Sequence, residues 1–136
     1  MASTSDDFDW VTAQAACSTE QMFQRLMDGA RKDVEQRTKA ASDREDDWSF
    51  EVHSDGEDHF EVARKADSGK GGAFVTFERV GPRINISGDG VDVELFAVVG
   101  INHSGECRYF VGEAEYLGWE IRKMALDLLF FEAQEE

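Results

Sequence analysis

The chain has 136 residues, of which 41% are hydrophobic, and it includes ten Phe and three Trp. This length and this aromatic content predict one globular domain and argue against a disordered chain. The formal net charge of −15 repels nucleic acids and anionic membrane surfaces. It leaves basic proteins as the natural partners.

The two cysteines, Cys17 and Cys107, are far apart and form no C-x-x-C motif, so we expect two free thiols. The sequence shows no secretion signal and no run of about eighteen apolar residues, and we therefore expect a cytoplasmic protein. Residues 1–7 are predicted to be a disordered tail, and residues 8–136 a single domain. The segment 8–17 fits either a short strand or a helical turn, and we expect the strand.

The first strong helix signal is Ser18, which can cap a helix and is answered by Gln21 at the third helical position. Gly29 lowers the helix propensity of the middle, so either one helix or a helix pair is expected. Asp33 and Arg37 are spaced to pair across one turn on the solvent side. The predicted apolar face is formed by Phe23, Leu26, Ala30 and Val34.

From Trp48 onward the hydrophobic period changes to two, which is typical of a half-buried antiparallel sheet. Six strands are predicted, with these inward-facing residues: Trp48/Phe50/Val52, Phe60/Val62, Val75/Phe77, Ile84/Ile86, Val91/Val93/Leu95/Ala97/Val99/Ile101 and Cys107/Tyr109/Val111. Tight connections set the expected register, with Gly105 in the left-handed conformation. The expected opposite pairs are Val52 with Phe60, Ile86 with Val91, and Ile101 with Cys107.

After Gly112 the chain is predicted to form a long helix that is apolar on two sides. One stripe is expected to pack on the sheet and consists of Leu117, Ile121, Met124, Leu128 and Phe131. The second stripe lies on the opposite side and consists of Trp119, Leu126 and Phe130, with Leu129 at its margin. An exposed patch of this size needs a cover. Three covers remain open: the N-terminal segments, a second copy or partner protein, or a small apolar ligand.

These elements predict a single α+β domain: an N-terminal helix or helix pair, a six-stranded antiparallel meander, and a long C-terminal helix packed on the sheet. This order is similar to the helix-grip arrangement of START-like proteins, although no sequence motif is shared. The resemblance implies a cavity between the sheet and the final helix.

The outer face of the predicted sheet also carries apolar residues among polar ones. Together with the second helix stripe, they complete the expected partner-binding set, which consists of Trp119, Leu126, Leu129, Phe130, Phe74, Phe96 and Phe110.

The hairpin "EVHSDGEDHFE" is the best candidate for metal chemistry, because it is expected to place His53 opposite His59 near several carboxylates. It matches no standard ligand spacing, and no set of residues for nucleophilic catalysis is evident. We therefore expect no cofactor and a non-enzymatic binding protein that acts through protein–protein contacts. A homodimer with an acidic surface for a basic partner is the leading hypothesis. A carrier of a small apolar ligand and a metal-dependent enzyme are the alternatives.

Overall fold

The computed structural model describes residues 7–40, 48–66 and 72–131, so most of the expected N-terminal tail lies outside the described residues. Two helices come first, then seven strands, then a third helix. The elements are α1 (Trp10–Ala16), α2 (Thr19–Ala40), β1 (Trp48–Ser54), β2 (His59–Ala66), β3 (Ala73–Val80), β4 (Arg83–Asp89), β5 (Glu94–Ile101), β6 (Cys107–Val111), β7 (Ala114–Tyr116) and α3 (Gly118–Phe131).

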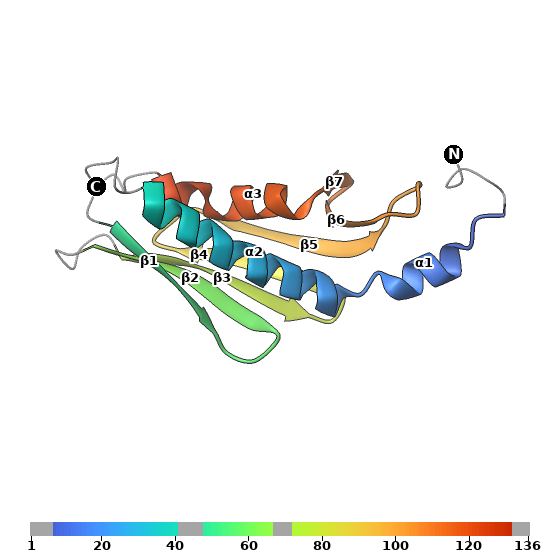
Figure 1. Ribbon diagram of the computed structural model, residues 1–136, viewed down its shortest axis with the longest axis horizontal. Helices are drawn as coiled ribbons and strands as arrows, with labels where there is room; N and C mark the ends of the chain where they lie inside the picture. The colour runs from blue at the N-terminus through green and yellow to red at the C-terminus, as the bar shows by residue number, and fades with distance from the viewer. Residues whose placement is uncertain (1–6, 41–47, 67–71, 132–136) are drawn as a thin grey trace.

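The strands form one antiparallel sheet in which each strand pairs with the next, from β1 to β7. Helices α2 and α3 lie side by side over one face of this sheet, while α1 projects from one end of the molecule (Figure 1). The predicted α+β class, the meander and the packing of the C-terminal helix are confirmed. The structure adds β7, which occupies a segment that was expected to be helical.

Residues 10–16 form a helix, so the expected short strand was wrong. The Asp9 carboxylate caps this helix by accepting hydrogen bonds from the Thr12 N–H at 3.1 Å and the Thr12 hydroxyl at 2.6 Å. These bonds lower the pKa of Asp9. No residue of α1 is buried, so local capping rather than packing against a sheet decides the conformation.

A disulfide joins Cys17, at the junction of α1 and α2, to Cys107 in β6. The prediction of free thiols was therefore wrong. The two cysteines are far apart along the sequence, but the fold brings β6 next to the junction of α1 and α2. Because disulfides are rare in the cytoplasm, this bond also counts against a cytoplasmic location. Among the described helices, none has the length and apolarity that a membrane crossing requires.

Helix α2 begins as predicted, because the Ser18 hydroxyl accepts a hydrogen bond from the Gln21 N–H at 3.2 Å. The helix then continues through Gly29 without interruption. A Cβ at position 29 would collide with the guanidinium group of Arg122. Gly29 therefore allows a side chain of α3 to cross α2 closely, and it does not divide the helix.

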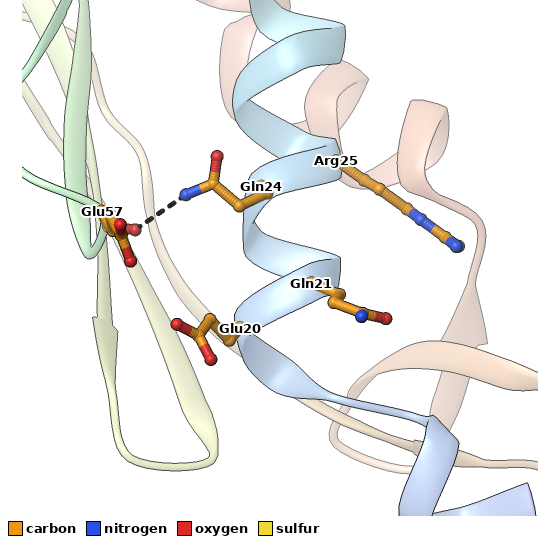
Figure 2. Close-up of a pocket in the computed structure, with 5 residues that line it drawn as sticks. All are labelled: Glu20, Gln21, Gln24, Arg25 and Glu57. Atoms are coloured by element: carbon orange, nitrogen blue, oxygen red, sulfur yellow. Dashed lines mark hydrogen bonds between the residues drawn. The ribbon is translucent and has the colours of Figure 1, made fainter.

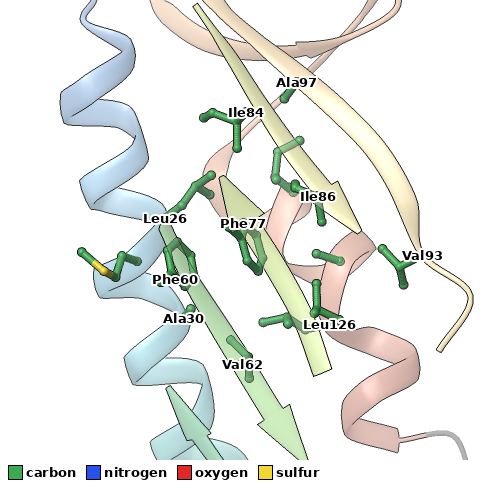
Figure 3. Close-up of a cluster of buried hydrophobic side chains, with 14 of the residues drawn as sticks. Leu26, Ala30, Phe60, Val62, Phe77, Ile84, Ile86, Val93, Ala97 and Leu126 are labelled. Atoms are coloured by element: carbon green, nitrogen blue, oxygen red, sulfur yellow. The ribbon is translucent and has the colours of Figure 1, made fainter. Parts of the chain in front are cut away.

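The hydrophobic core lies between the sheet and the helix pair, where side chains from α2, β2 to β4 and α3 meet (Figure 3). Phe60 stacks on Phe77 with ring centroids 4.4 Å apart, and Phe23 lies 5.3 Å from Phe60. All three rings are fully buried. At this position the space that a helix-grip cavity would occupy is filled by aromatic side chains.

The register between β5 and β6 is confirmed, with Ile101 opposite Cys107. Gly105 in the connecting loop has the expected positive φ of 83°. This loop is short, and its glycine is at the position where a left-handed residue is required.

Two other predicted registers were wrong. Ile86 lies opposite Leu95 and not Val91, because β5 begins only at Glu94. Val52 lies opposite Val62 and not Phe60. Both shifts are by an even number of residues, so every side chain stays on its predicted face of the sheet.

Candidate functional site

Helix α3 buries only part of the predicted core stripe: Ile121 is fully buried and Leu128 packs against the core. The buried residues are Ile121, Ala125, Leu126, Leu129 and Phe130. From the predicted core stripe, Leu117, Met124 and Phe131 instead remain exposed. The helix contacts the sheet and α2 at the same time, which turns its covered surface toward α2. Leu126 and Leu129 thus belong to the core of this chain. Helix α2 is the element that covers them, which the sequence had left undecided.

Two buried arginines bind the last turn of α3. The Nε of Arg37 donates to the carbonyl oxygen of Phe130 at 2.7 Å, and the Nη1 of Arg64 donates to that of Leu129 at 3.0 Å. The last carbonyls of a helix lack intrahelical donors and carry partial negative charge, so cations are favourable there. Arg37 was expected to pair with Asp33 in solvent, and its burial contradicts that expectation.

A groove of about 450 Å³ runs between α2 and α3, and we call it the helix groove. Leu126 and Phe130, which are almost completely buried, form its apolar floor. Trp119 and Phe131 also line it, with 56% and 46% of their surface exposed. The charged residues that line it are Asp33, Arg37, Arg122, Lys123 and Asp127.

The charges of the helix groove are largely neutralised within the chain. The Nε of Arg122 lies 2.8 Å from the carboxylate of Asp33, and the Nζ of Lys123 lies 3.1 Å from that of Asp127. Burial raises the pKa of Asp33, and the nearby Arg122 only partly opposes this. The groove therefore presents apolar surface between paired charges.

The helix pair differs in charge from the rest of the molecule. Helices α2 and α3, which we call the helix layer, contain seven basic and six acidic residues, a net charge of +1. The remaining residues contain seven basic and twenty-three acidic ones, a net charge of −16. The acidic character of the protein therefore lies outside the helix layer.

Four large apolar residues are exposed on or next to α3, and we call them the helix-layer patch: Leu117, Trp119, Met124 and Phe131. Leu117, Met124 and Phe131 recur at seven-residue intervals and so share one side of the helix. Trp119 lies on the other side of α3, and both Trp119 and Phe131 line the helix groove. Of these four, the sequence identified only Trp119 as a contact residue, because the other three were assigned to the core.

The outer face of the sheet brings together part of its predicted contact residues. Val98 lies opposite Phe110, and Phe96 is its neighbour on the same face of β5, with 47% of its surface exposed. The guanidinium of Arg83 lies 4.7 Å from the Phe96 ring centroid. Phe74 lies opposite Asp89, at the end of β4, and does not join this group.

The predicted metal site is not assembled as expected. His53 lies opposite Glu61 rather than His59, and its Nε2 lies 2.9 Å from the carboxylate of Glu51. Within the described parts of the chain, no group of three or more His, Cys, Asp or Glu residues is arranged to hold a metal ion.

A second hollow, of about 640 Å³, lies between the start of α2 and the β1–β2 turn (Figure 2). The side-chain amide of Gln24 donates to the carbonyl oxygen of Glu57 at 3.2 Å. Glu20 lies beside this bond, whereas Arg25 extends from the opposite side of α2 (Figure 2). The hollow is lined by carboxylates, amides and one guanidinium, and it contains no pairing of a nucleophile with a base.

No protein-family model, curated protein or solved structure matches this chain. Function must therefore be inferred from the geometry of the chain itself.

Proposed function

We propose that this protein is a non-enzymatic binding protein that forms a homodimer through its helix layer and binds a basic protein through its acidic surface. The observation that carries this proposal is the position of the helix-layer patch. Exposed apolar side chains flank α3 on both sides, in a layer of net charge +1, in a chain whose remaining residues carry −16.

The charge distribution favours a second copy as the occupant of the helix layer. Two copies that meet through their acidic surfaces bring many like charges together, which opposes association. In the helix layer the Asp33–Arg122 and Lys123–Asp127 pairs are already neutralised. Two copies that meet there keep the carboxylates of the described strands and turns apart.

The apolar gain is comparable with the cost of association. Covering a half-exposed large apolar side chain is worth on the order of 1 kcal/mol. A two-fold contact uses each residue of the patch twice, and the sum is comparable with the roughly 4–15 kcal/mol that association costs. We therefore expect a weak dimer that forms at high protein concentration rather than an obligate dimer.

The acidic surface supports the second part of the proposal. The β1–β2 hairpin exposes the carboxylates of Asp55 and Glu57, whereas Glu51 pairs with Lys65 at 3.2 Å and Asp58 pairs with Arg79 at 2.8 Å. A surface of this charge attracts basic proteins over distances of about a Debye length. The Cys17–Cys107 disulfide further supports an oxidising compartment as the place where this partner is met, in contrast to the cytoplasm expected from the sequence.

A small apolar ligand is a second candidate occupant of the helix groove. The volume of about 450 Å³ and the floor of Leu126 and Phe130 fall within the usual range of ligand sites. Native mass spectrometry of the purified protein separates the two ideas. A retained small molecule supports a carrier, whereas a bare dimer supports self-association.

The dimer is tested by sedimentation velocity on the wild type and on three variants. Trp119→Glu and Met124→Glu each place a charge in the helix-layer patch, and we expect each to raise the dissociation constant by about tenfold or more. Phe96→Glu is the matched control, because Phe96 is as exposed as Phe131 but lies on the opposite face of the sheet. A wild type that stays monomeric at high concentration, or a Phe96→Glu variant that dissociates equally, contradicts the proposal.

A further inference from the structure

A third hollow is basic in a protein that is otherwise strongly acidic. It measures about 170 Å³ and lies where the first turns of α2 and α3 meet β6 and β7. Two arginine side chains line it, Arg25 from α2 and Arg122 from α3. Arg108 of β6 also borders it, but its side chain lies on the outer face of the sheet, beside Glu115. No Asp or Glu is among the described residues that line it. The chain contains twice as many acidic as basic residues, with 29 against 14, so this lining departs from its composition.

The carboxylate partners of these arginines lie outside the hollow. Arg122 pairs with Asp33 at 2.8 Å, on the side of the helix groove. Arg108 uses Nη2 for Glu106 at 3.1 Å, Nε for Glu115 at 3.7 Å and Nη1 for the carbonyl oxygen of Cys107 at 2.9 Å, so its guanidinium is directed away from the hollow. About a fifth of the Arg122 side chain and a quarter of the Arg108 side chain are exposed, so both are partly desolvated.

Arg25 stands at the open rim and is the least compensated of the three. Its Nη1 contacts the sulfur of Met22 at 3.8 Å, and within the described residues it forms no ion pair with a carboxylate. Its side chain points away from the acidic Glu57, toward the side of α2 where α3 and β6 lie (Figure 2). A guanidinium that faces a hollow without a counter-ion has donors available for a ligand.

The wall of the hollow is held in place by buried contacts. The hydroxyl of Tyr109 donates to the carbonyl oxygen of Met22 at 2.7 Å and links β6 to α2. Arg122 crosses Gly29, where no side chain could be accommodated beneath it. The arginines therefore project from elements that are fixed relative to one another.

We infer that this hollow binds a small oxyanion of the size of inorganic phosphate, held by Arg25 and Arg122. Guanidinium groups bind phosphate oxygens through paired N–H donors, and charge-assisted bonds of this kind are the strong ones. Gly118, the first residue of α3, also lines the hollow, and the helix dipole adds a favourable field for an anion. The volume suits one tetrahedral anion, and the net charge of −15 opposes the approach of a polyanion such as a nucleic acid.

Calorimetric titration of the full chain with inorganic phosphate, at constant ionic strength set with chloride, tests this inference. We expect saturable binding, and we expect Arg25→Gln to weaken it by about tenfold, because one charge-assisted donor group is lost. Arg31→Gln is the matched control, since Arg31 is another exposed arginine of α2 that pairs with Asp28 and does not line the hollow. It should bind phosphate like the wild type.

Parallel titrations with sulfate and acetate define the ligand class. Binding of phosphate and sulfate that exceeds binding of acetate supports a site for tetrahedral oxyanions. The inference is overturned if the wild type gives no saturable signal at millimolar phosphate, or if acetate binds equally well. It is also overturned if Arg25→Gln and Arg31→Gln, both folded, bind phosphate equally.

Discussion

Removal of the disulfide should destabilise this protein strongly, because the bond closes most of the chain into one loop. Cys17 and Cys107 are 90 residues apart. In the chain-entropy model, a cross-link over that length removes about 15 cal/mol/K from the unfolded state, or roughly 4.6 kcal/mol at 25 °C. This is a large part of the roughly 5–15 kcal/mol by which domains are normally stable.

The double variant Cys17→Ala/Cys107→Ala isolates this effect without burying a new polar group. Urea unfolding, followed by Trp fluorescence and by circular dichroism, should show a free energy of unfolding lowered by about 3–5 kcal/mol. The unfolded state should also expand, which steepens the dependence on urea.

A reducing agent supplies the control for this prediction. It should lower the stability of the wild type to the level of the double variant, and it should have no effect on the variant itself. Equal stability of the oxidised wild type and the variant would refute the reasoning, as would two titratable thiols in the unreduced native protein.

Three further predictions test other parts of the structure. Arg37→Met should lower the free energy of unfolding by roughly 1.5–3 kcal/mol, because the Phe130 carbonyl loses a charged donor; chemical denaturation measures this, and an unchanged midpoint would show that the bond contributes nothing. Burial raises the pKa of Tyr109 from 10.0 to about 12. The unfolded state therefore loses the phenolic proton first, and the free energy of unfolding should fall as pH rises between these values. Tyr109→Phe should flatten this part of the dependence of stability on pH, and an identical pH profile would contradict the raised pKa of Tyr109. The dissociation constant of the homodimer should fall as salt rises from about 0.01 to 0.15 M, because screening weakens repulsion between the acidic surfaces, whereas binding of a basic partner should weaken. Sedimentation velocity at several salt concentrations measures this effect. A dimer that dissociates when salt is added would count against an interface in the helix layer.

The fold class and the two faces of the sheet could be predicted because they depend on local periodicity. Alternation fixes which residues face inward. The predicted inward faces were therefore correct even though the partners of Val52 and Ile86 were wrong by two and four positions. The register itself depends on where each turn begins. The sequence around Gly88 allows more than one turn length, so the register could not be read from it.

The orientation of α3 could not be predicted, because the helix is apolar around most of its circumference. Periodicity gives the candidate stripes, but only the position of α2 decides which of them is covered. With α2 beside it, Leu126 and Phe130 are buried, and Met124 and Phe131 remain in solvent. Met124 and Phe131 were therefore not predicted as contact residues, because the sequence had assigned them to the core.

Contacts between distant segments were also outside the reach of sequence patterns. Arg37 and Arg64 both bind the end of α3, and Cys17 meets Cys107, although no local motif connects any of these residues. The convergence of Arg25 and Arg122 is of the same kind, because each arginine looks like an ordinary surface residue within its own element. Such sites appear only when the elements are placed together.

An isotope-filtered nuclear Overhauser experiment on a mixture of labelled and unlabelled chains tests the central proposal most directly, since it detects only contacts between two copies. The helix-layer interface predicts intermolecular signals from the side chains of Leu117, Trp119, Met124 and Phe131. Intermolecular signals from Phe96 and Val98 instead, or none at the highest concentration at which the protein stays in solution, would contradict it.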